Sequence, residues 1–232
     1  MTRRILITGT TRGLGRYLAE HYLGLGDLVV GCGRSTSTIS HDRYIHQQLD
    51  ITHDESVSSV FAALRAQPGG LDVLINNAGT ATMNAFALTP LSTIRRVMDT
   101  NFFAAAAMTH GAIRLLRRSN TARIVNITSV AVPLRLEGEA VYAASKSALE
   151  VFTRVIAREV GSLGITCNAV GPSVIRTKLT EGVPAEKLDR LVRGQAVPRE
   201  ATGADVANAI DFFLKPESSL ITGQVVYLGG YG

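Results

Sequence analysis

The sequence has no tryptophan, only two cysteines and no long uninterrupted apolar run. A helix that crosses a membrane needs roughly 18 or more apolar residues in a row, and no stretch of this chain reaches that length. Residues 1–7 place charge before a short apolar run, but the run breaks at Thr8-Gly9, too soon for a cleavable signal peptide. We therefore expect no membrane partner and a cytoplasmic location.

The two cysteines limit the chemistry further. Cys32 and Cys167 both lie in apolar runs typical of strands, and neither belongs to a group with metal-ligand spacing. Buried free thiols are typical of proteins in the reducing cytosol. We predict neither a disulfide nor a bound metal.

Charged residues make up 19% of the chain and hydrophobic residues 46%, a composition that favours a large core over disorder. The formal net charge is +5. The basic residues are scattered, and no stripe combines them with aromatics, so we expect no nucleic-acid partner. The excess of positive charge fits an anionic small-molecule ligand, and the remainder is interpreted as a solvated surface.

Strand-like runs alternate with helical runs along nearly the whole chain, without a repeat or linker. We predict strands at 4–8, 28–32, 44–49, 72–76, 123–128, 165–170 and 224–228, and helices at 14–24, 54–66, 90–118, 140–162 and 203–214. This alternation indicates a parallel sheet with right-handed crossovers and helices on both faces. The predicted fold is one α/β domain over residues 1–232, a Rossmann-type doubly wound sheet of about seven strands. Ligands of such sheets bind beyond the carboxyl ends of the strands.

A glycine-rich loop joins the first predicted strand to the first helix. Glycine lets the backbone turn sharply and approach a ligand closely, and the following helix offers free N–H groups to a pyrophosphate. The spacing is G-x-x-x-G-x-G, and glycines can also serve a turn alone. The predicted phosphate-binding residues are Gly9, Thr11, Arg12, Gly13, Leu14 and Gly15.

The second predicted strand ends at Arg34 and is followed by no carboxylate before Asp42. An acidic residue here typically binds the ribose 2′-hydroxyl of NAD, whereas arginine accommodates the 2′-phosphate of NADP. Arg12 and Arg34 therefore favour NADP(H) over NAD(H), although both can be ordinary surface residues. Asp50 and Ile51 end the third strand, where Asp50 could bind the adenine amino group or cap the next helix.

Tyr142 and Lys146 lie four residues apart in a predicted helix and so share a face. A cation beside a phenol lowers the tyrosine pKa, which makes proton exchange near neutrality feasible. Such pairs also occur by chance on exposed helices. Ser129 ends a predicted strand at the edge where ligands bind, and its hydroxyl could hold a substrate oxygen beside Tyr142.

With these motifs in order, the sequence resembles the short-chain dehydrogenase/reductase family over almost its whole length. The matching motifs are the glycine loop, Asn76-Asn77-Ala78-Gly79 after the fourth strand, Asn101 in the long helix, Ser129, Tyr142 and Lys146. The interval of 13 residues between Ser129 and Tyr142 is also what the family shows. Several independent motifs in register make the resemblance specific.

The resemblance implies a role for each of these residues. Tyr142 would be the general acid in reduction and the base in oxidation, while Lys146 would hold the nicotinamide ribose and lower the tyrosine pKa. Ser129 would orient the carbonyl, and Asn101 would keep a water in the proton relay or serve a helix kink. The implied cofactor contacts also include Asn77, Ala78, Gly79, Pro172, Ile175 and Thr177. Ser173 stands where many members have glycine, which leaves the local backbone open.

Within the family, the closest overall look is that of 3-oxoacyl-carrier-protein reductases. Leu163 stands where such reductases often have a base, so a specialised ketone reductase is as plausible. The substrate is either a small ketone or an acyl thioester, and substrate choice should lie in residues 80–93, 130–141 and 178–197. We expect the third segment to form a small lid, and Arg135 and Glu137 could bind a polar substrate or be solvated.

Two other functions are open. The chain could bind NADP(H) without catalysis, as a regulatory or scaffold protein, although a binder has no need of Tyr142. A sugar-nucleotide epimerase is disfavoured, because that group carries a larger C-terminal region. The resemblance also implies a homotetramer or homodimer built through the helices at 90–118 and 140–162.

Overall fold

The computed structural model describes residues 2–67 and 69–230 and contains one seven-stranded sheet in the order β3-β2-β1-β4-β5-β6-β7. All six strand pairings are parallel. The strands are β1 (Arg4–Thr8), β2 (Leu28–Gly33), β3 (Tyr44–Gln48), β4 (Val73–Asn76), β5 (Arg123–Ile127), β6 (Thr166–Gly171) and β7 (Val225–Tyr227). This confirms the predicted doubly wound sheet, and no strand end differs from its predicted position by more than one residue.

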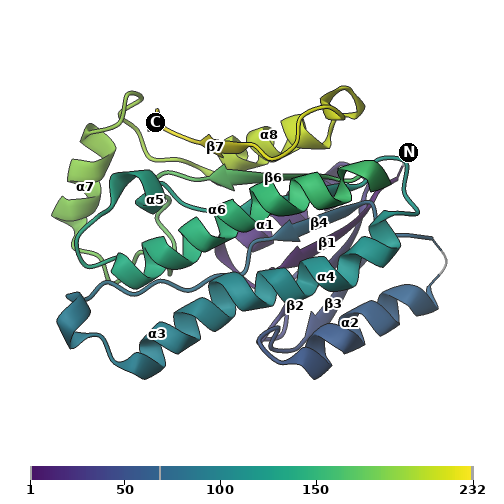
Figure 1. The fold of residues 1–232 in the computed structure, drawn as a ribbon, viewed down its shortest axis with the longest axis horizontal. Coiled ribbons are helices and arrows are strands. Elements are labelled where there is room, and N and C mark those ends of the chain that lie inside the picture. Colours follow the sequence, from purple (N-terminus) through teal and green to yellow (C-terminus); the bar gives the residue numbers. More distant parts are fainter. Residues whose placement is uncertain (1, 68, 231–232) are drawn as a thin grey trace.

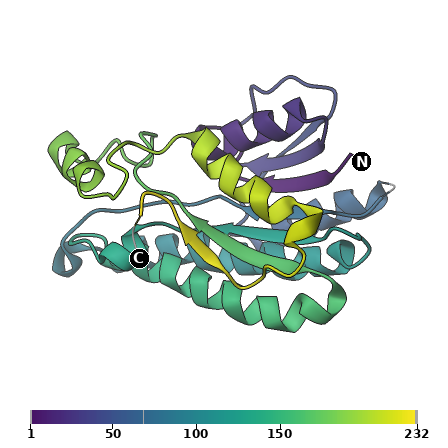
Figure 2. The same ribbon diagram turned by 90° about the horizontal axis from the view of Figure 1, so that it is seen from above.

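Helices cover both faces of the sheet, as Figures 1 and 2 show. One face carries α2 (Asp54–Ala66), α4 (Ala104–Leu116) and α6 (Ala140–Val160), and the other carries α1 (Gly13–Gly24) and α8 (Gly203–Leu214). A strand covered on both faces has no solvated side, so it reads as a continuous apolar run rather than an alternating one. Every residue of β1 and β4 is accordingly buried.

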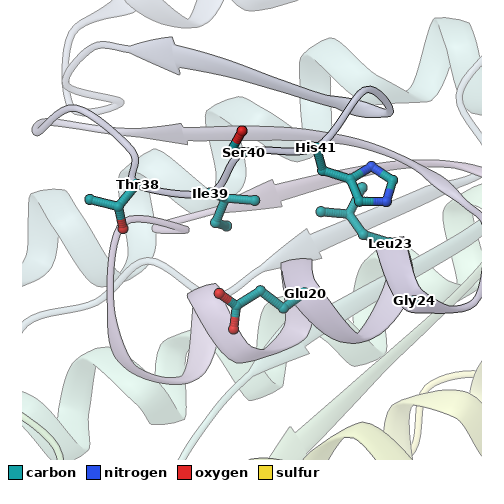
Figure 3. A pocket seen from close by; sticks show the side chains of 7 residues that line it. All are labelled: Glu20, Leu23, Gly24, Thr38, Ile39, Ser40 and His41. Atoms are coloured by element: carbon teal, nitrogen blue, oxygen red, sulfur yellow. The ribbon is translucent and has the colours of Figure 1, made fainter.

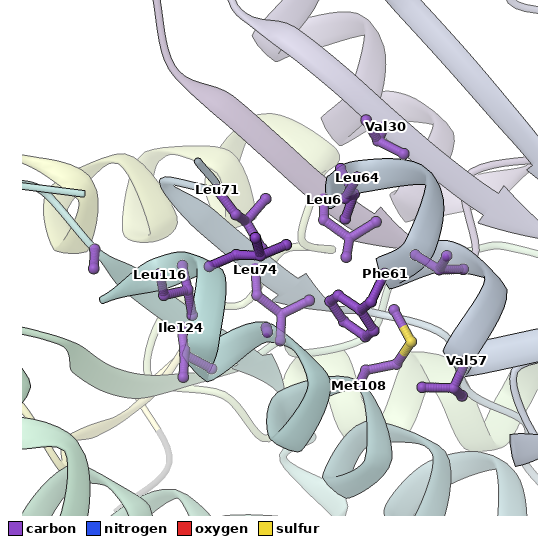
Figure 4. Close-up of a cluster of buried hydrophobic side chains, with 14 of the residues drawn as sticks. Leu6, Val30, Val57, Phe61, Leu64, Leu71, Leu74, Met108, Leu116 and Ile124 are labelled. Atoms are coloured by element: carbon purple, nitrogen blue, oxygen red, sulfur yellow. The ribbon is translucent and has the colours of Figure 1, made fainter. Parts of the chain in front are cut away.

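Two apolar clusters fill the space between the sheet and its helices. In the first, Leu6 and Leu74 from the strands pack with Phe61 of α2 and Met108 of α4 (Figure 4). The second lies on the opposite face and joins β1, β4 and β5 to α1 and α8 through side chains such as Ile7. At roughly 25 cal/mol per Å² of apolar area removed from water, these clusters are the main stabilising contribution.

The predicted helix over 90–118 is interrupted at its centre. Helix α3 (Leu91–Met98) runs into a π turn at Asp99–Phe103, and α4 continues from there. π turns are rare and often mark functional positions. Two short helices were not predicted, α5 (Ala131–Leu134) and α7 (Ala185–Arg193). None of the described helices is long and apolar enough to cross a membrane.

The order of the strands positions the site. Strand β1 lies between β2 and β4, so the chain winds outwards in opposite directions on its two sides. A crevice forms at the carboxyl ends of the strands at such a switch point. The segments that follow β1, β4, β5 and β6 therefore converge at one edge of the sheet, and α7 extends from the body beside them (Figure 2).

Candidate functional site

A cavity of about 1120 Å³ lies at the carboxyl ends of the strands. Its wall is built by the segments after β1, β2, β3, β4, β5 and β6 together with parts of α6 and α7. The sequence-predicted residues in the wall are Gly9, Thr11, Arg12, Gly13, Leu14, Gly15, Arg34, Asp50, Ile51, Asn77, Ala78, Gly79, Ser129, Tyr142, Lys146, Pro172, Ile175 and Thr177. Asn101 is the one predicted residue outside this set.

The glycine loop has a backbone that other residues would not adopt. Gly9 and Gly13 have φ values of 77° and 56°, in the left-handed region where a Cβ is unfavourable. Gly15 is needed for a different reason, because a Cβ there would lie 2.2 Å from the carbonyl oxygen of Gly9. The first turn of α1 can therefore approach the loop closely, with its free N–H groups beside the cavity.

Asn77 fastens this loop to the neighbouring strand. Its Nδ2 donates to the carbonyl oxygen of Thr8 at 2.9 Å, and its backbone N–H donates to the Thr8 hydroxyl at 3.0 Å. The N–H of Ala78 donates to the same hydroxyl at 2.9 Å. The Asn-Asn-Ala-Gly motif thus holds the glycine loop in place as well as lining the cavity.

Two arginines lie at the end of the cavity near β2. Arg12 is the residue before α1, and Arg34 follows β2. Both side chains are exposed, and among residues 2–67 and 69–230 neither guanidinium forms an ion pair. Both remain available for an anionic group bound in the cavity.

Asp50 lies in the same part of the wall but does not cap α2, whose preceding residue is His53. It accepts from the backbone N–H and the hydroxyl of Thr52 at 3.0 and 2.8 Å. Burial raises the pKa of Asp50, but these hydrogen bonds and the charge of Arg34 outweigh it, so its pKa is lowered. The carboxylate is thus held in a turn at the cavity edge.

Tyr142 is on the first turn of α6 and is buried beside Ser129. Burial raises the pKa of Tyr142 to about 12, the Ser129 hydroxyl opposes this by hydrogen bonding, and the charge of Glu139 raises it further. The described side chains therefore keep the phenol protonated at neutral pH, in contrast to the expected lowering by Lys146. A protonated phenol inside a cavity is suited to donate a proton.

Lys146 lies one helical turn after Tyr142, with its ammonium buried. Its Nζ donates to the carbonyl oxygen of Ile127 at 2.8 Å, which fixes the side chain against the end of β5. Burial lowers the pKa of Lys146 to about 8, because a charged amine loses its hydration there. A Cβ on Gly79 would lie 3.4 Å from this nitrogen, so Lys146 faces the Asn-Asn-Ala-Gly segment.

Asn101 is buried at the π turn and braces the site from behind. Its Nδ2 donates to the carbonyl oxygen of Thr80 and to the hydroxyl of Ser145, both at 2.9 Å. Its Oδ1 accepts from the Thr80 N–H at 2.8 Å. The side chain connects the segment after β4 to α6, and it does so at the interruption of the helix, the place where the sequence analysis allowed a kink.

The segment after β6 covers the other side of the cavity. Pro172, Ile175 and Thr177 line it, and a Cβ on Gly13 would lie 3.8 Å from the methyl group of Thr177. Ser173 keeps this backbone in order, since its hydroxyl donates to Gln195 at 2.7 Å. The departure from glycine at this position thus adds a hydrogen bond between the covering segment and the region after α7.

Glu139 is one of several wall residues that were not among the predicted site residues. Glu139 lines the cavity one turn before Tyr142, whereas its neighbours Arg135 and Glu137 are exposed and do not line it. A glutamate in a polar stretch gives no signal of burial, and only the packing of α5 and α6 produces it. The pattern of the sequence around Glu139 therefore could not show that its side chain lines the cavity.

A second, smaller depression of about 310 Å³ lies between α1 and residues 38–41 (Figure 3). Glu20 projects towards it from α1, and His41 lies at its far end. It has no lining residue in common with the large cavity and does not lie at the carboxyl ends of the strands. The catalytic candidates are all in or beside the large cavity.

The comparisons with known proteins agree with this geometry. A family model described as enoyl-(acyl carrier protein) reductase matches residues 9–231. The 3-oxoacyl-[acyl-carrier-protein] reductase of Vibrio cholerae is 31% identical over 231 residues, which cover 97% of this chain and 95% of that protein. The equivalent reductase of Pseudomonas aeruginosa is 30% identical over 97% of this chain and 95% of its own.

Solved structures give the same result. The ligand-free aldohexose dehydrogenase of Thermoplasma acidophilum is 28% identical with a TM-score of 0.90, and the match covers 99% of this chain and 94% of that one. ElxO with NADP bound is 26% identical with the same TM-score, covering 100% and 99%. The fold and the site define an oxidoreductase with a doubly wound sheet. The chain belongs to the short-chain dehydrogenase/reductase family, whose chemistry interconverts an alcohol and a carbonyl group.

Proposed function

We propose that the protein is an NADP(H)-dependent reductase that converts a ketone to an alcohol, or runs the reverse reaction, with Tyr142 as the general acid and base. The observation that carries the proposal is the position of Tyr142. Its phenol is buried beside Ser129, whose hydroxyl acts to lower the pKa of Tyr142, in the wall of the same cavity that begins at the glycine loop. A binding protein without catalysis would not need a buried, protonated phenol there.

The residues of the cavity fit a dinucleotide with a 2′-phosphate. The absence of a Cβ at Gly15 lets the start of α1 pack directly on the glycine loop. The free N–H groups of the first turn of α1 then lie beside the cavity, which suits a pyrophosphate. Arg12 and Arg34 supply two cations without ion-pair partners in the described part of the chain, and these suit the additional phosphate. When bound, the nicotinamide supplies or accepts the hydride.

The protein's own residues handle the proton and the carbonyl. Ser129 and Tyr142 hold the carbonyl oxygen by hydrogen bonds, and Tyr142 Oη gives its proton to that oxygen as the carbon is reduced. Lys146, fixed on the carbonyl of Ile127, would hold the ribose of the nicotinamide beside Tyr142. Asn101 keeps Thr80 and Ser145 in place and so positions both walls, alongside its proposed place in a proton relay.

The substrate enters at the end of the cavity bounded by residues 178–197. Lys178, Leu179, Val183, Leu188 and Leu191 of this segment line the cavity, and α7 lies within it. We propose that this segment is a small lid on a domain that spans the chain, and that the lid excludes water during the reaction. The named relatives act on a 3-oxoacyl thioester and on an aldohexose, so both kinds of carbonyl are candidates here.

We also propose a homo-oligomer, a tetramer or dimer, assembled through α4 and α6. The rings of Phe102 and Phe103 at the start of α4 lie 5.3 Å apart, and Phe102 lies 5.9 Å from Phe152 of α6. Phe103 and Val151 are each 58% exposed, which leaves apolar area for a partner. A monomer mass by light scattering across working concentrations would contradict this proposal.

The central test combines nucleotide binding with turnover. NADPH should bind by fluorescence titration, and NADPH absorbance should fall when ketones and 3-oxoacyl thioesters are offered. Tyr142→Phe should lower kcat by about a hundredfold or more and keep the affinity for NADPH. Tyr17→Phe, at an exposed position of α1, should change neither kcat nor that affinity. Tyr142→Phe with wild-type turnover would refute the assigned role, and tight NADPH binding without any turnover would favour a non-catalytic binding protein.

A further inference from the structure

The substrate end of the cavity combines apolar side chains with threonine hydroxyls, the cations Arg96, Arg176 and Lys178, and one carboxylate. Its apolar side chains come from the segment after β4, from the turn before α6 and from the lid, and they are Met83, Leu136, Val183, Leu188 and Leu191. Glu139 lies among them, immediately before the first residue of α6. Its backbone is fixed, because its carbonyl oxygen accepts from the Ala143 N–H at 2.8 Å. The backbone of Glu139 is therefore fixed one helical turn before Tyr142.

The carboxylate of Glu139 has no hydrogen-bond or ion-pair partner among residues 2–67 and 69–230. Burial raises its pKa, and the charge of Lys187 opposes this. Its own charge raises the pKa of Tyr142, so it acts electrostatically on the group that handles the proton. Glu139 is half-buried in the cavity wall, so water hydrates its carboxylate until a ligand binds. A ligand that displaces this water leaves the carboxylate without a partner unless it supplies a hydrogen-bond donor of its own.

No neighbouring cation forms an ion pair with Glu139 in residues 2–67 and 69–230. The ammonium of Lys187 on α7 donates to the carbonyl oxygen of Glu137 at 3.1 Å and to the sulfur of Met83 at 3.7 Å. Arg96 of α3 donates to the hydroxyl of Thr80 at 3.1 Å. Arg176, also in the wall, is paired with Asp189 and Glu200. Lys146 lies a further turn along α6, fixed on β5.

We propose that Glu139 is a specificity-determining residue that accepts a hydrogen bond from a hydroxyl group next to the reacting carbonyl, so that the substrate is a hydroxyketone. This inference rests on the reductase function proposed above. The carbonyl carbon receives the hydride, the carbonyl oxygen receives the proton of Tyr142, and the product is a vicinal diol. Glu139 exchanges no proton in the step.

The alternatives are less compatible with this wall. A substrate with a carboxylate or phosphate beside the carbonyl would be repelled by Glu139. A ketone with only hydrocarbon at this point would leave the carboxylate desolvated and unpartnered, and sites built to bind a substrate hydroxyl discriminate strongly against analogues that lack it. The apolar side chains around Glu139 exclude water and so sharpen that discrimination.

Three four-carbon ketones test the inference: acetoin, which carries the hydroxyl, butanone, which lacks it, and acetoacetate, which carries a negative charge. With NADPH, wild-type kcat/KM for acetoin should exceed that for butanone by about tenfold or more, with acetoacetate lowest. Glu139→Gln should lower the acetoin value by about tenfold while the butanone value stays the same or rises. Glu137→Gln, two residues away and exposed outside the cavity, should leave all three values unchanged.

The pH profile separates this role from a structural one. Because the negative charge of Glu139 raises the pKa of Tyr142, its removal should move the alkaline limb of kcat/KM to lower pH for every ketone. A change of fold alone would not move it in that direction. Calorimetry gives a second readout that needs no turnover. With NADP⁺ present, the acetoin product 2,3-butanediol should bind more tightly than the butanone product 2-butanol. Glu139→Gln should lose this preference.

Two results would overturn the inference, and they differ in what they leave standing. If wild type reduces butanone or an acyl thioester as well as acetoin, and Glu139→Gln keeps that ratio, Glu139 does not select the substrate although the reductase function holds. If NADPH binds but neither acetoin nor any other carbonyl compound is reduced, the proposed function fails and the inference fails with it.

Discussion

The two ends of the cavity are built in different ways. The nucleotide end consists of turns that leave buried strands directly. Hydrogen bonds between backbone groups and short polar side chains hold it together, as in those that join Asn77 and Ala78 to Thr8. The substrate end consists of α5, α7 and the loops around them, and side chains hold it together. Its ties include the ion pairs of Arg176 with Asp189 and Glu200, all close to half exposed.

This difference suits two different tasks. A cofactor is the same molecule in every turnover, so its site gains from a backbone that permits one geometry. A substrate must enter and leave, and weakly tethered elements outside the core open at lower free energy than the sheet does. Substitutions at the two ends should therefore have effects of different size and kind.

The largest effect is expected at Gly15. A Cβ there would lie 2.2 Å from the Gly9 oxygen and 2.4 Å from Asn77 Nδ2, so Gly15→Ala must displace the loop, at a cost of about 1–3 kcal/mol or more. NADPH affinity measured by fluorescence titration should fall by more than about a hundredfold. Gly24→Ala is the matched control, since no atom lies within 4 Å of its Cβ position on the same helix, and its affinity should equal that of wild type. Equal affinity in Gly15→Ala would show that the nucleotide does not bind this loop.

The nucleotide end is also the part that the sequence predicted well. Positive-φ glycines, buried apolar strands and a helix start produce local patterns, and the predicted helix at 54–66 agrees with α2 at both ends. The positions of the polar motif residues could be predicted as well, because each motif comes directly after a strand. Local sequence is sufficient there because the sheet fixes where each strand end must lie.

The substrate end was predicted less fully for a physical reason. Helix α5 has only four residues and contains Pro133, too few for a periodic pattern. Helix α7 follows Pro184 and carries mostly charged residues around Leu188, so its pattern was compatible with simple packing. The π turn at Asn101 depends on contacts with Thr80 and Ser145 that are distant in sequence. These features arise from tertiary packing, which spacing alone does not encode.

An intermediate effect is expected at Arg34, where the nucleotide end meets solvent. Arg34→Ala should weaken NADPH binding by about tenfold to a hundredfold, in line with roughly 1.5–3 kcal/mol for a charge-assisted hydrogen bond, and leave NADH binding unchanged. Arg95→Ala provides the control, because it removes the same charge from an exposed position of α3 outside the cavity. Parallel titrations with NADPH and NADH measure both affinities for wild type and for each variant. Wild-type protein that binds NADH as tightly as NADPH would contradict the proposed preference.

The smallest effect is expected at the tether of the lid. Arg176→Gln removes the ion pairs to Asp189 on α7 and to Glu200, and exposed pairs of this kind contribute little to global stability. We therefore expect an unchanged melting temperature and NADPH affinity, with a KM for the ketone that rises a few-fold because α7 is less often closed.

Arg199→Gln is the control for the lid, since it removes an exposed pair with Asp205 at the start of α8, outside the cavity wall, and should leave KM unchanged. Steady-state kinetics with one ketone and saturating NADPH separate the two variants. If Arg176→Gln lowered NADPH affinity as much as it raised KM, the two ends of the cavity would be coupled through the segment after β6. The contrast between a rigid nucleotide end and a loosely tethered substrate end would then be wrong, because the same segment would control both.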